Sequence, residues 1–215
     1  DDAVVQATDV TDKRIKVVFR NENGHISRAS NSALALAAGE FAVFLDHDDE
    51  LSQHALYMLA EELIAHPGAQ LLYSDEDKIS SYGQRHNPHF KSDWNPDLLL
   101  SQNYICHLTA IRLSLIRETG GFREDFEGAQ DWDLILRVSE RLQPEQIRHI
   151  PHVLYHWRVI EGSTAQSTAF KPYVLKAQAR AVGEHLERCA VKGAQVEILQ
   201  DISHLRVRFP LPVEP

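Results

Sequence analysis

Apolar runs alternate with segments of helical spacing along the first half of the chain. Three runs, 15–19, 41–45 and 70–74, are apolar enough to predict strands. The segments between them, 27–38 and 52–66, are rich in Ala and Leu and predict helices. The run 41–45 has no polar residue, as expected for a strand covered on both faces of a parallel sheet. This order predicts an α/β fold with a mostly parallel sheet flanked by helices.

The second half of the chain has a less regular pattern. Residues 80–96 are polar and contain Gly and Pro, so they predict a long loop. Further elements are expected downstream: strands at 105–112, 148–157 and 196–199, and helices at 114–119, 131–142 and 173–189. The tail 206–212 alternates and then carries two prolines, which indicates an edge strand running into a linker. We therefore expect one domain over 1–200, followed by an edge strand and linker over 201–215.

Composition and charge exclude several functions. The 215 residues include 22 basic and 31 acidic side chains, for a formal net charge of −9. Without a basic patch, nucleic acid is not an expected partner. The longest apolar stretch, 33–45, is interrupted by a Gly-Glu pair and is too short to span a bilayer. The chain starts with two acidic residues, unlike a signal peptide. Cys106 and Cys189 form no CxxC pair, so free thiols in the cytoplasm are expected.

An acidic motif follows the run 41–45. Asp46 and Asp48 are two residues apart on an extended chain, so they point the same way, with backbones about 6.5–7 Å apart. Two such carboxylates repel unless a cation lies between them, and oxygen ligands favour Mg²⁺ or Mn²⁺. A calcium-binding EF-hand is excluded, because Leu51 and Tyr57 stand where Gly and Glu are required. The alternative is a solvated acidic turn that caps the next helix.

A second candidate site lies at 126–133, where a helix is predicted to begin. Asp131 is close to the helix N-terminus, where the dipole and unpaired N–H groups favour a carboxylate. A carboxylate there can accept a proton from a substrate hydroxyl. The alternative is that Asp131 only caps the helix, and Asp133 is expected to cap it or to pair with Arg137.

The third candidate, Tyr-His-Trp-Arg at 155–158, ends an extended segment. His156 can complete an oxygen-rich metal site, and Arg158 can bind a diphosphate in bidentate fashion. Five of the 12 histidines are interpreted as structural or surface residues: His54, His66, His107, His149 and His185. No P-loop, GxGxxG motif or Ser or Cys nucleophile arrangement is present.

Taken in order, these motifs resemble the family 2 inverting glycosyltransferases of the GT-A fold, over about residues 15–165. The resemblance rests on five pieces: Glu22-Asn23-Gly24 through Asn31, Gly39-Glu40 through Asp49, Arg112 with Gly120-Gly121-Phe122, Gln130-Asp131-Trp132-Asp133, and Tyr155-His156-Trp157-Arg158. Gln130 stands where the family usually has Glu, and Ser30 where many members have Arg. The family's first strand is not found, so the resemblance implies that the N-terminal part of the fold is incomplete.

The resemblance implies a role for each motif. Asp48, helped by Asp46, would hold Mn²⁺ or Mg²⁺ on the diphosphate of a nucleotide-sugar donor, with His156 as the third protein ligand. Asp131 would be the general base that deprotonates the acceptor hydroxyl. Contacts to the donor are implied for three residues: Asp46, Asp49 and Arg158.

The resemblance also implies partners. Residues 162–171 would close over the donor, and a saccharide or lipid-linked saccharide would be the acceptor. Four residues are candidates for contacting that acceptor: Asp75, Asp77, Trp94 and Trp132. The tail resembles the linker to a second module in tandem bacterial glycosyltransferases, which build cell-surface polysaccharide at the inner face of the cytoplasmic membrane. Two other functions stay open, a non-catalytic carbohydrate- or partner-binding module and a metal-dependent phosphoester hydrolase.

Overall fold

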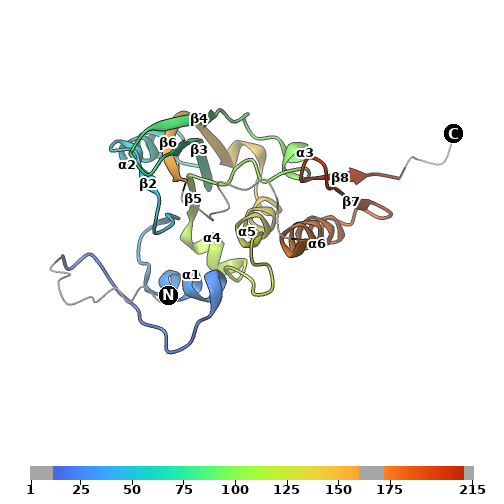
Figure 1. Ribbon diagram of the computed structural model, residues 1–215, viewed down its shortest axis with the longest axis horizontal. Coiled ribbons are helices and arrows are strands. Elements are labelled where there is room, and N and C mark those ends of the chain that lie inside the picture. The colour runs from blue at the N-terminus through green and yellow to red at the C-terminus, as the bar shows by residue number, and fades with distance from the viewer. Residues whose placement is uncertain (1–11, 160–171, 211–215) are drawn as a thin grey trace.

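A mixed six-stranded sheet forms the centre of the computed structural model, which describes residues 12–159 and 172–210 (Figure 1). Its strands are β1 (Phe41–Val43), β2 (Glu50–Leu51), β3 (Leu71–Ile79), β4 (Arg85–His89), β5 (Thr109–Arg112) and β6 (Ile147–Arg158). The spatial order is β1-β5-β3-β6-β2, and β4 pairs with β3 outside this path. The two longest strands, β3 and β6, therefore lie side by side in the middle.

Helices surround this sheet. Within the described ranges they are α1 (His25–Leu36), α2 (Ala55–Ala65), α3 (Pro96–Leu99), α4 (Leu113–Glu118), α5 (Gln130–Ser139) and α6 (Pro172–Arg188), with a 3-10 turn at Pro144–Gln146. No helix in these two ranges is both long and apolar enough to cross a bilayer. The predicted helices are thus found, with ends shifted by a few residues.

The sheet corrects the expectation of a mostly parallel arrangement. Only β3 and β6 run parallel, whereas β1 with β5, β3 with β5, β3 with β4, and β2 with β6 are antiparallel. A parallel return needs a long crossover, usually a helix. Between β3 and β5 the chain forms β4 and the four-residue helix α3 instead. The segment 80–96, expected as a loop, therefore contributes a strand.

Two further expectations about strands were wrong. The strand predicted at 70–74 continues through the acidic triplet 75–77, because β6 pairs with β3 along its whole length. The run 15–19 forms no strand, and Phe19 in it is 64% exposed. No described strand pairs with 15–19, and an apolar run without a partner strand has no ladder to join.

The core occupies both faces of the sheet. Leu71 and Tyr73 pack on the face covered by α4, α5 and α6, and Leu72 packs on the face covered by α2. This division follows from the two-residue period of a strand. Both faces of the sheet are therefore covered by helices, which leaves the ends of its strands uncovered by this packing.

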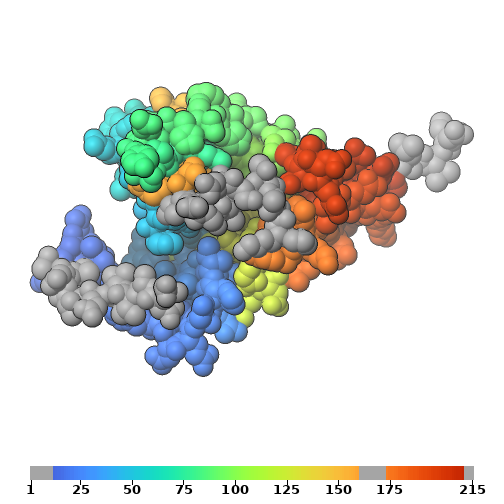
Figure 2. Space-filling model, viewed as in Figure 1, coloured from blue at the N-terminus to red at the C-terminus, as the bar shows by residue number. Residues whose placement is uncertain are grey.

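The C-terminal part of the described chain is a hairpin of β7 (Gln195–Leu199) and β8 (His204–Arg208). In Figure 1 it lies beside α6, and Figure 2 shows it on the opposite side of the molecule from residues 12–24, which are coloured blue. Leu205 is 1% exposed, and its N–H donates to the carbonyl of Ser101 over 2.9 Å. The hairpin is therefore packed onto the core.

Candidate active site

The acidic loop, residues 46–49, connects β1 to β2 and is held by the end of β6. The backbone N–H of Arg158 donates to Oδ1 of Asp49 over 2.7 Å. Nε of Arg158 donates to the carbonyl of Asp48 over 2.7 Å, and its Nη2 pairs with Glu50. Nε of Arg158 thus binds the acidic loop and Nη2 binds the adjacent residue of β2, so this side chain ties the loop to the end of β6.

The side chain of Tyr155 holds the acidic loop through two hydrogen bonds. Its hydroxyl donates to Oδ2 of Asp49 over 2.5 Å and accepts the N–H of Asp46 over 3.2 Å. Burial raises the pKa of Tyr155, and its hydrogen bond to Asp49 raises it further. The phenol therefore stays protonated at physiological pH and keeps donating to the carboxylate.

His107 completes a group of three ligands at this loop. Its ring stacks on Tyr155, with the two ring centroids 4.5 Å apart, and Nε2 lies 4.0 Å from Oδ2 of Asp46. The ligand atoms of Asp46, Asp49 and His107 all lie within 4.8 Å of one another. His107 was expected to be a structural or surface residue, and the structure places it beside the acidic loop.

A buried ion pair supports the segment 101–108, which carries His107. Nζ of Lys91 lies 3.2 Å from Oε2 of Glu76 and also donates to the carbonyls of Ile105 and His107. Oε2 of Glu76 accepts the N–H of His107 over 3.2 Å. Burial alone would raise the pKa of Glu76, but Lys91 and neighbouring histidines lower it to about 2. Both backbone polar groups of His107 are therefore fixed by one charge pair.

Asp131 lies in the first turn of α5, close to the acidic loop. Nδ2 of Asn103 donates to Oδ2 of Asp131 over 2.8 Å. Burial raises the pKa of Asp46, and the charges of Asp49, Asp131 and Asp48 add to the effect against the opposing charge of a histidine. The negative charges of three neighbouring carboxylates thus act on Asp46, and a cation at the acidic loop would offset them.

His156 does not join this group, which corrects the predicted pairing with Asp48. The hydroxyl of Tyr155 reaches the acidic loop, whereas the ring of His156 is turned to β3. Nδ1 of His156 lies 2.6 Å from Oδ1 of Asp77 in the neighbouring strand β3, and His156 is only 7% exposed. Within the described residues, His107 rather than His156 is therefore the histidine grouped with Asp46 and Asp49.

Three of the four residues predicted to contact the acceptor are buried: Asp75, Asp77 and Trp132. Asp75 and Asp77 are 3% and 4% exposed within β3, where each is paired with a histidine. Trp132 is buried, and its Nε1 donates to the carbonyl of Leu99 over 2.9 Å. Trp94 packs near Glu140, at the opposite end of α5 from the acidic loop. The predicted closing segment 162–171 lies outside the described residues.

Sequence reasoning missed two functional candidates, His107 and Asn103. Both lie in the connection before β5, where no repeat, spacing or charge run marks them. The one available signal was a histidine between apolar residues, which more often indicates a core position. Their proximity to the acidic loop results from β5 pairing with β1, which brings distant segments together.

The mixed sheet, its flanking helices and the carboxylates at its edge define an α/β fold of the GT-A type. A family model described as Glycosyl transferase family 2 matches residues 1–120, and the chain belongs to this family. The chain is similar to the S. aureus protein TarS in its complex with UDP-GlcNAc, with a TM-score of 0.55 and 18% identity over 74% of this chain and 46% of that one. At that identity the likeness concerns the fold.

Three curated bacterial relatives extend the comparison. The chain is 51% identical over 204 residues to the uncharacterized protein y4gI of Sinorhizobium fredii. It is 39% identical over 205 residues to the O-antigen biosynthesis protein RfbC of Myxococcus xanthus, and 25% identical over 150 residues to a chondroitin synthase of Pasteurella multocida. These matches cover 95%, 95% and 69% of this chain but 22%, 16% and 15% of the relatives. The chain thus spans about a fifth of their length.

Proposed function

We propose that this chain transfers a sugar from a nucleotide-diphosphate donor to a hydroxyl of a saccharide acceptor, with inversion, in the synthesis of cell-surface polysaccharide. The observation that carries the proposal is the gathering of Asp131 with the acidic loop, 46–49, in a family 2 chain. The relatives named for O-antigen and chondroitin synthesis support the saccharide acceptor. The UDP-GlcNAc complex of TarS supports a nucleotide-sugar donor.

The acidic loop and His107 fit a hard divalent cation. Two carboxylates and an imidazole with ligand atoms within 4.8 Å of one another suit Mn²⁺ or Mg²⁺, and the charges of neighbouring carboxylates add to the burial that raises the pKa of Asp46. Asp46, Asp49 and His107 would hold the ion, with Asp48 beside them. When bound, the ion would neutralise charge on the donor diphosphate. Asp46 and Asp49 would thereby also contact the donor.

Asp131 acts as the general base in this proposal. Asn103 holds Oδ2, which leaves Oδ1 to accept the proton of the acceptor hydroxyl. The acceptor oxygen forms a bond to the anomeric carbon while the carbon–oxygen bond to the diphosphate breaks, and that electron pair leaves with the nucleoside diphosphate. A single displacement places the new bond opposite the old one, so the anomeric configuration inverts.

The catalytic unit would be one module of a longer protein, because the relatives that it matches are several times longer. The unit would include the hairpin through β8, since Leu205 is buried in the core. This extends the expected boundary at residue 200. A second glycosyltransferase module would then follow the tail.

The experiment compares Asp131→Asn with the exposed control Asp201→Asn. Release of UDP from UDP-GlcNAc is measured with Mn²⁺ and a panel of saccharide acceptors, and binding of UDP is measured separately. Asp131→Asn is expected to lower the rate about 10²–10⁴-fold, with Mn²⁺-dependent UDP binding retained. Asp201→Asn should behave like the wild type. If Asp131→Asn released UDP at the wild-type rate, Asp131 would not be the general base. If the wild type bound none of UDP, GDP and dTDP, the proposed transfer from a nucleotide-sugar donor would be refuted.

A further inference from the structure

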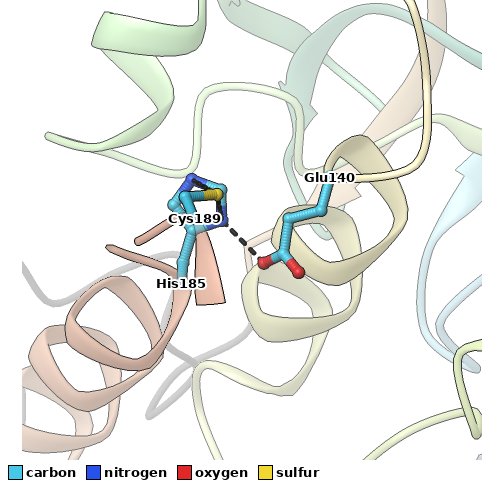
Figure 3. A group of neighbouring side chains, drawn as sticks. All are labelled: Glu140, His185 and Cys189. Carbon is cyan, nitrogen blue, oxygen red and sulfur yellow. Dashed lines mark hydrogen bonds and ion pairs between the residues drawn. The ribbon is translucent and has the colours of Figure 1, made fainter. Parts of the chain in front are cut away.

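A second group of possible ligands lies where helix α6 meets the end of α5. Figure 3 shows Glu140, directly after α5, facing His185 and Cys189 of the α6 segment. Nδ1 of His185 lies 2.7 Å from Oε1 of Glu140, and Sγ of Cys189 lies 3.9 Å from each ring nitrogen of His185. The ligand atoms of this cluster all lie within 4.8 Å of one another. Glu140 is nine residues from Asp131, about 14 Å along the helix axis, so the cluster is separate from the acidic loop.

We propose that Glu140, His185 and Cys189 form a zinc site that ties α6 to the end of α5. The distances suit this ion. Zinc bonds of 2.0–2.3 Å in a tetrahedron place neighbouring ligand atoms about 3.3–3.6 Å apart. The observed separations of 2.7 and 3.9 Å lie on either side of that range. In the proposed site the three side chains would rotate to bring their ligand atoms to that spacing.

The ligand types in this cluster favour Zn²⁺ over the Mn²⁺ or Mg²⁺ proposed for the acidic loop. A cysteine thiolate is a soft ligand that favours Zn²⁺, whereas carboxylate-rich sets favour Mg²⁺ and Mn²⁺. His185 and Cys189 are four residues apart, which places both on one face of a helix. Glu140 comes from the other helix, so a bound ion would join two elements. The pair of helices would then be held by coordination as well as by packing.

The surroundings of the cluster support three protein ligands and one open position. The side chains of His185 and Glu140 are each 16% exposed, whereas Cys189 is exposed. The cluster borders a cavity of about 170 Å³ whose other walls include Trp94 and Leu136. A water molecule or a small ligand entering from that side could complete the tetrahedron.

Arg188 orients the carboxylate of the cluster. Its Nε and Nη2 donate to Glu140 over 2.7–2.9 Å, and its Nη1 lies 3.8 Å from Glu184. Ligating carboxylates are commonly hydrogen-bonded in this way by a second residue. With a thiolate and a carboxylate as ligands, Zn²⁺ would be neutralised, so the guanidinium of Arg188 would face no net positive charge.

The test measures metal binding to the full chain under reducing conditions. Competition of Zn²⁺ against a chromogenic chelator is expected to reveal one site that His185→Gln or Cys189→Ser weakens at least about tenfold. The matched control is His152→Gln, because His152 is exposed and lies outside the cluster, and it should keep wild-type affinity. In the wild type, Co²⁺ should add a thiolate-to-metal charge-transfer band in the near ultraviolet, which Cys189→Ser removes.

Two results would overturn the site. One is equal zinc affinity in the wild type, His185→Gln and Cys189→Ser. The other is a Co²⁺ complex of the wild type without the thiolate band, a result that depends on no variant and therefore on no variant's folding. Mn²⁺ at the same concentration serves as the comparison ion, because it should bind the acidic loop and leave the zinc titration unchanged.

Discussion

Replacing Lys91 by Met tests the buried ion pair that supports His107. The side chain of Lys91 is fully buried, and that of Glu76 is 10% exposed. Methionine would fill much of the space but would leave the carboxylate and two backbone carbonyls without their donor. Removing one member of a buried ion pair costs about 3–5 kcal/mol. Against the effect of burial, Lys91 together with His89 and His107 lowers the pKa of Glu76 from 4.5 to about 2, which corresponds to about 3 kcal/mol shared among these partners. We therefore expect Lys91→Met to lose about 3 kcal/mol of unfolding free energy.

The assay for this variant is urea unfolding at pH 7, followed by circular dichroism. The matched control is Lys192→Met at an exposed lysine, which should change stability by less than about 0.5 kcal/mol. The double variant Lys91→Met/Glu76→Gln should recover part of the loss, because it leaves no unpaired buried charge. If Lys91→Met loses less than about 1 kcal/mol, or if the double variant is as unstable as the single one, the buried ion pair does not stabilise the fold as expected.

Three other perturbations test the same framework. The pKa of Glu76 is lowered in the folded state, so its contribution to stability is present above about pH 4.5 and is lost as the pH falls towards 2. Thermal unfolding between these pH values should show this loss of stability in the wild type and a smaller loss in Glu76→Gln. Tyr155→Phe removes the donor to Asp49 and should cost about 1.5–3 kcal/mol in urea unfolding, and an unchanged midpoint would contradict this. Asp133→Ala leaves two partly buried arginines without their fully buried partner and should cost about 3–5 kcal/mol, and a loss below about 1 kcal/mol would argue against a structural role for Asp133.

Elements with a strong local pattern were predicted well. The helix expected at 173–189 is α6 (Pro172–Arg188), and the extended segment expected at 148–157 is β6 (Ile147–Arg158). In both, the apolar spacing matches the element that packs on the core. The direction of each strand was not predictable in the same way. The continuous apolar run 41–45 predicted a strand buried on both faces, but β1 is an outermost strand whose residues are only half-buried, and Leu45 is 49% exposed. Such a run also carries no information about the direction of its neighbour.

The candidate site was predicted in part for a related reason. Asp46, Asp49 and Asp131 were singled out from local sequence, and the structure gathers them. His107 was missed and His156 was chosen, because the two-residue period places neighbours on opposite faces without saying which face meets the acidic loop. Which side chains of β6 lie near the acidic loop depends on the pairing of β2 with the end of β6, about a hundred residues away in the chain.

The most direct measurement of the central claim, that the acidic loop and His107 form one cation site for the donor, is calorimetric titration of UDP in the presence of Mn²⁺. His107→Gln is compared with His47→Gln, whose side chain belongs to the acidic loop but is 96% exposed. The account predicts that His107→Gln weakens Mn²⁺-dependent UDP binding at least about tenfold and that His47→Gln binds as the wild type does. Unchanged binding by His107→Gln would contradict it.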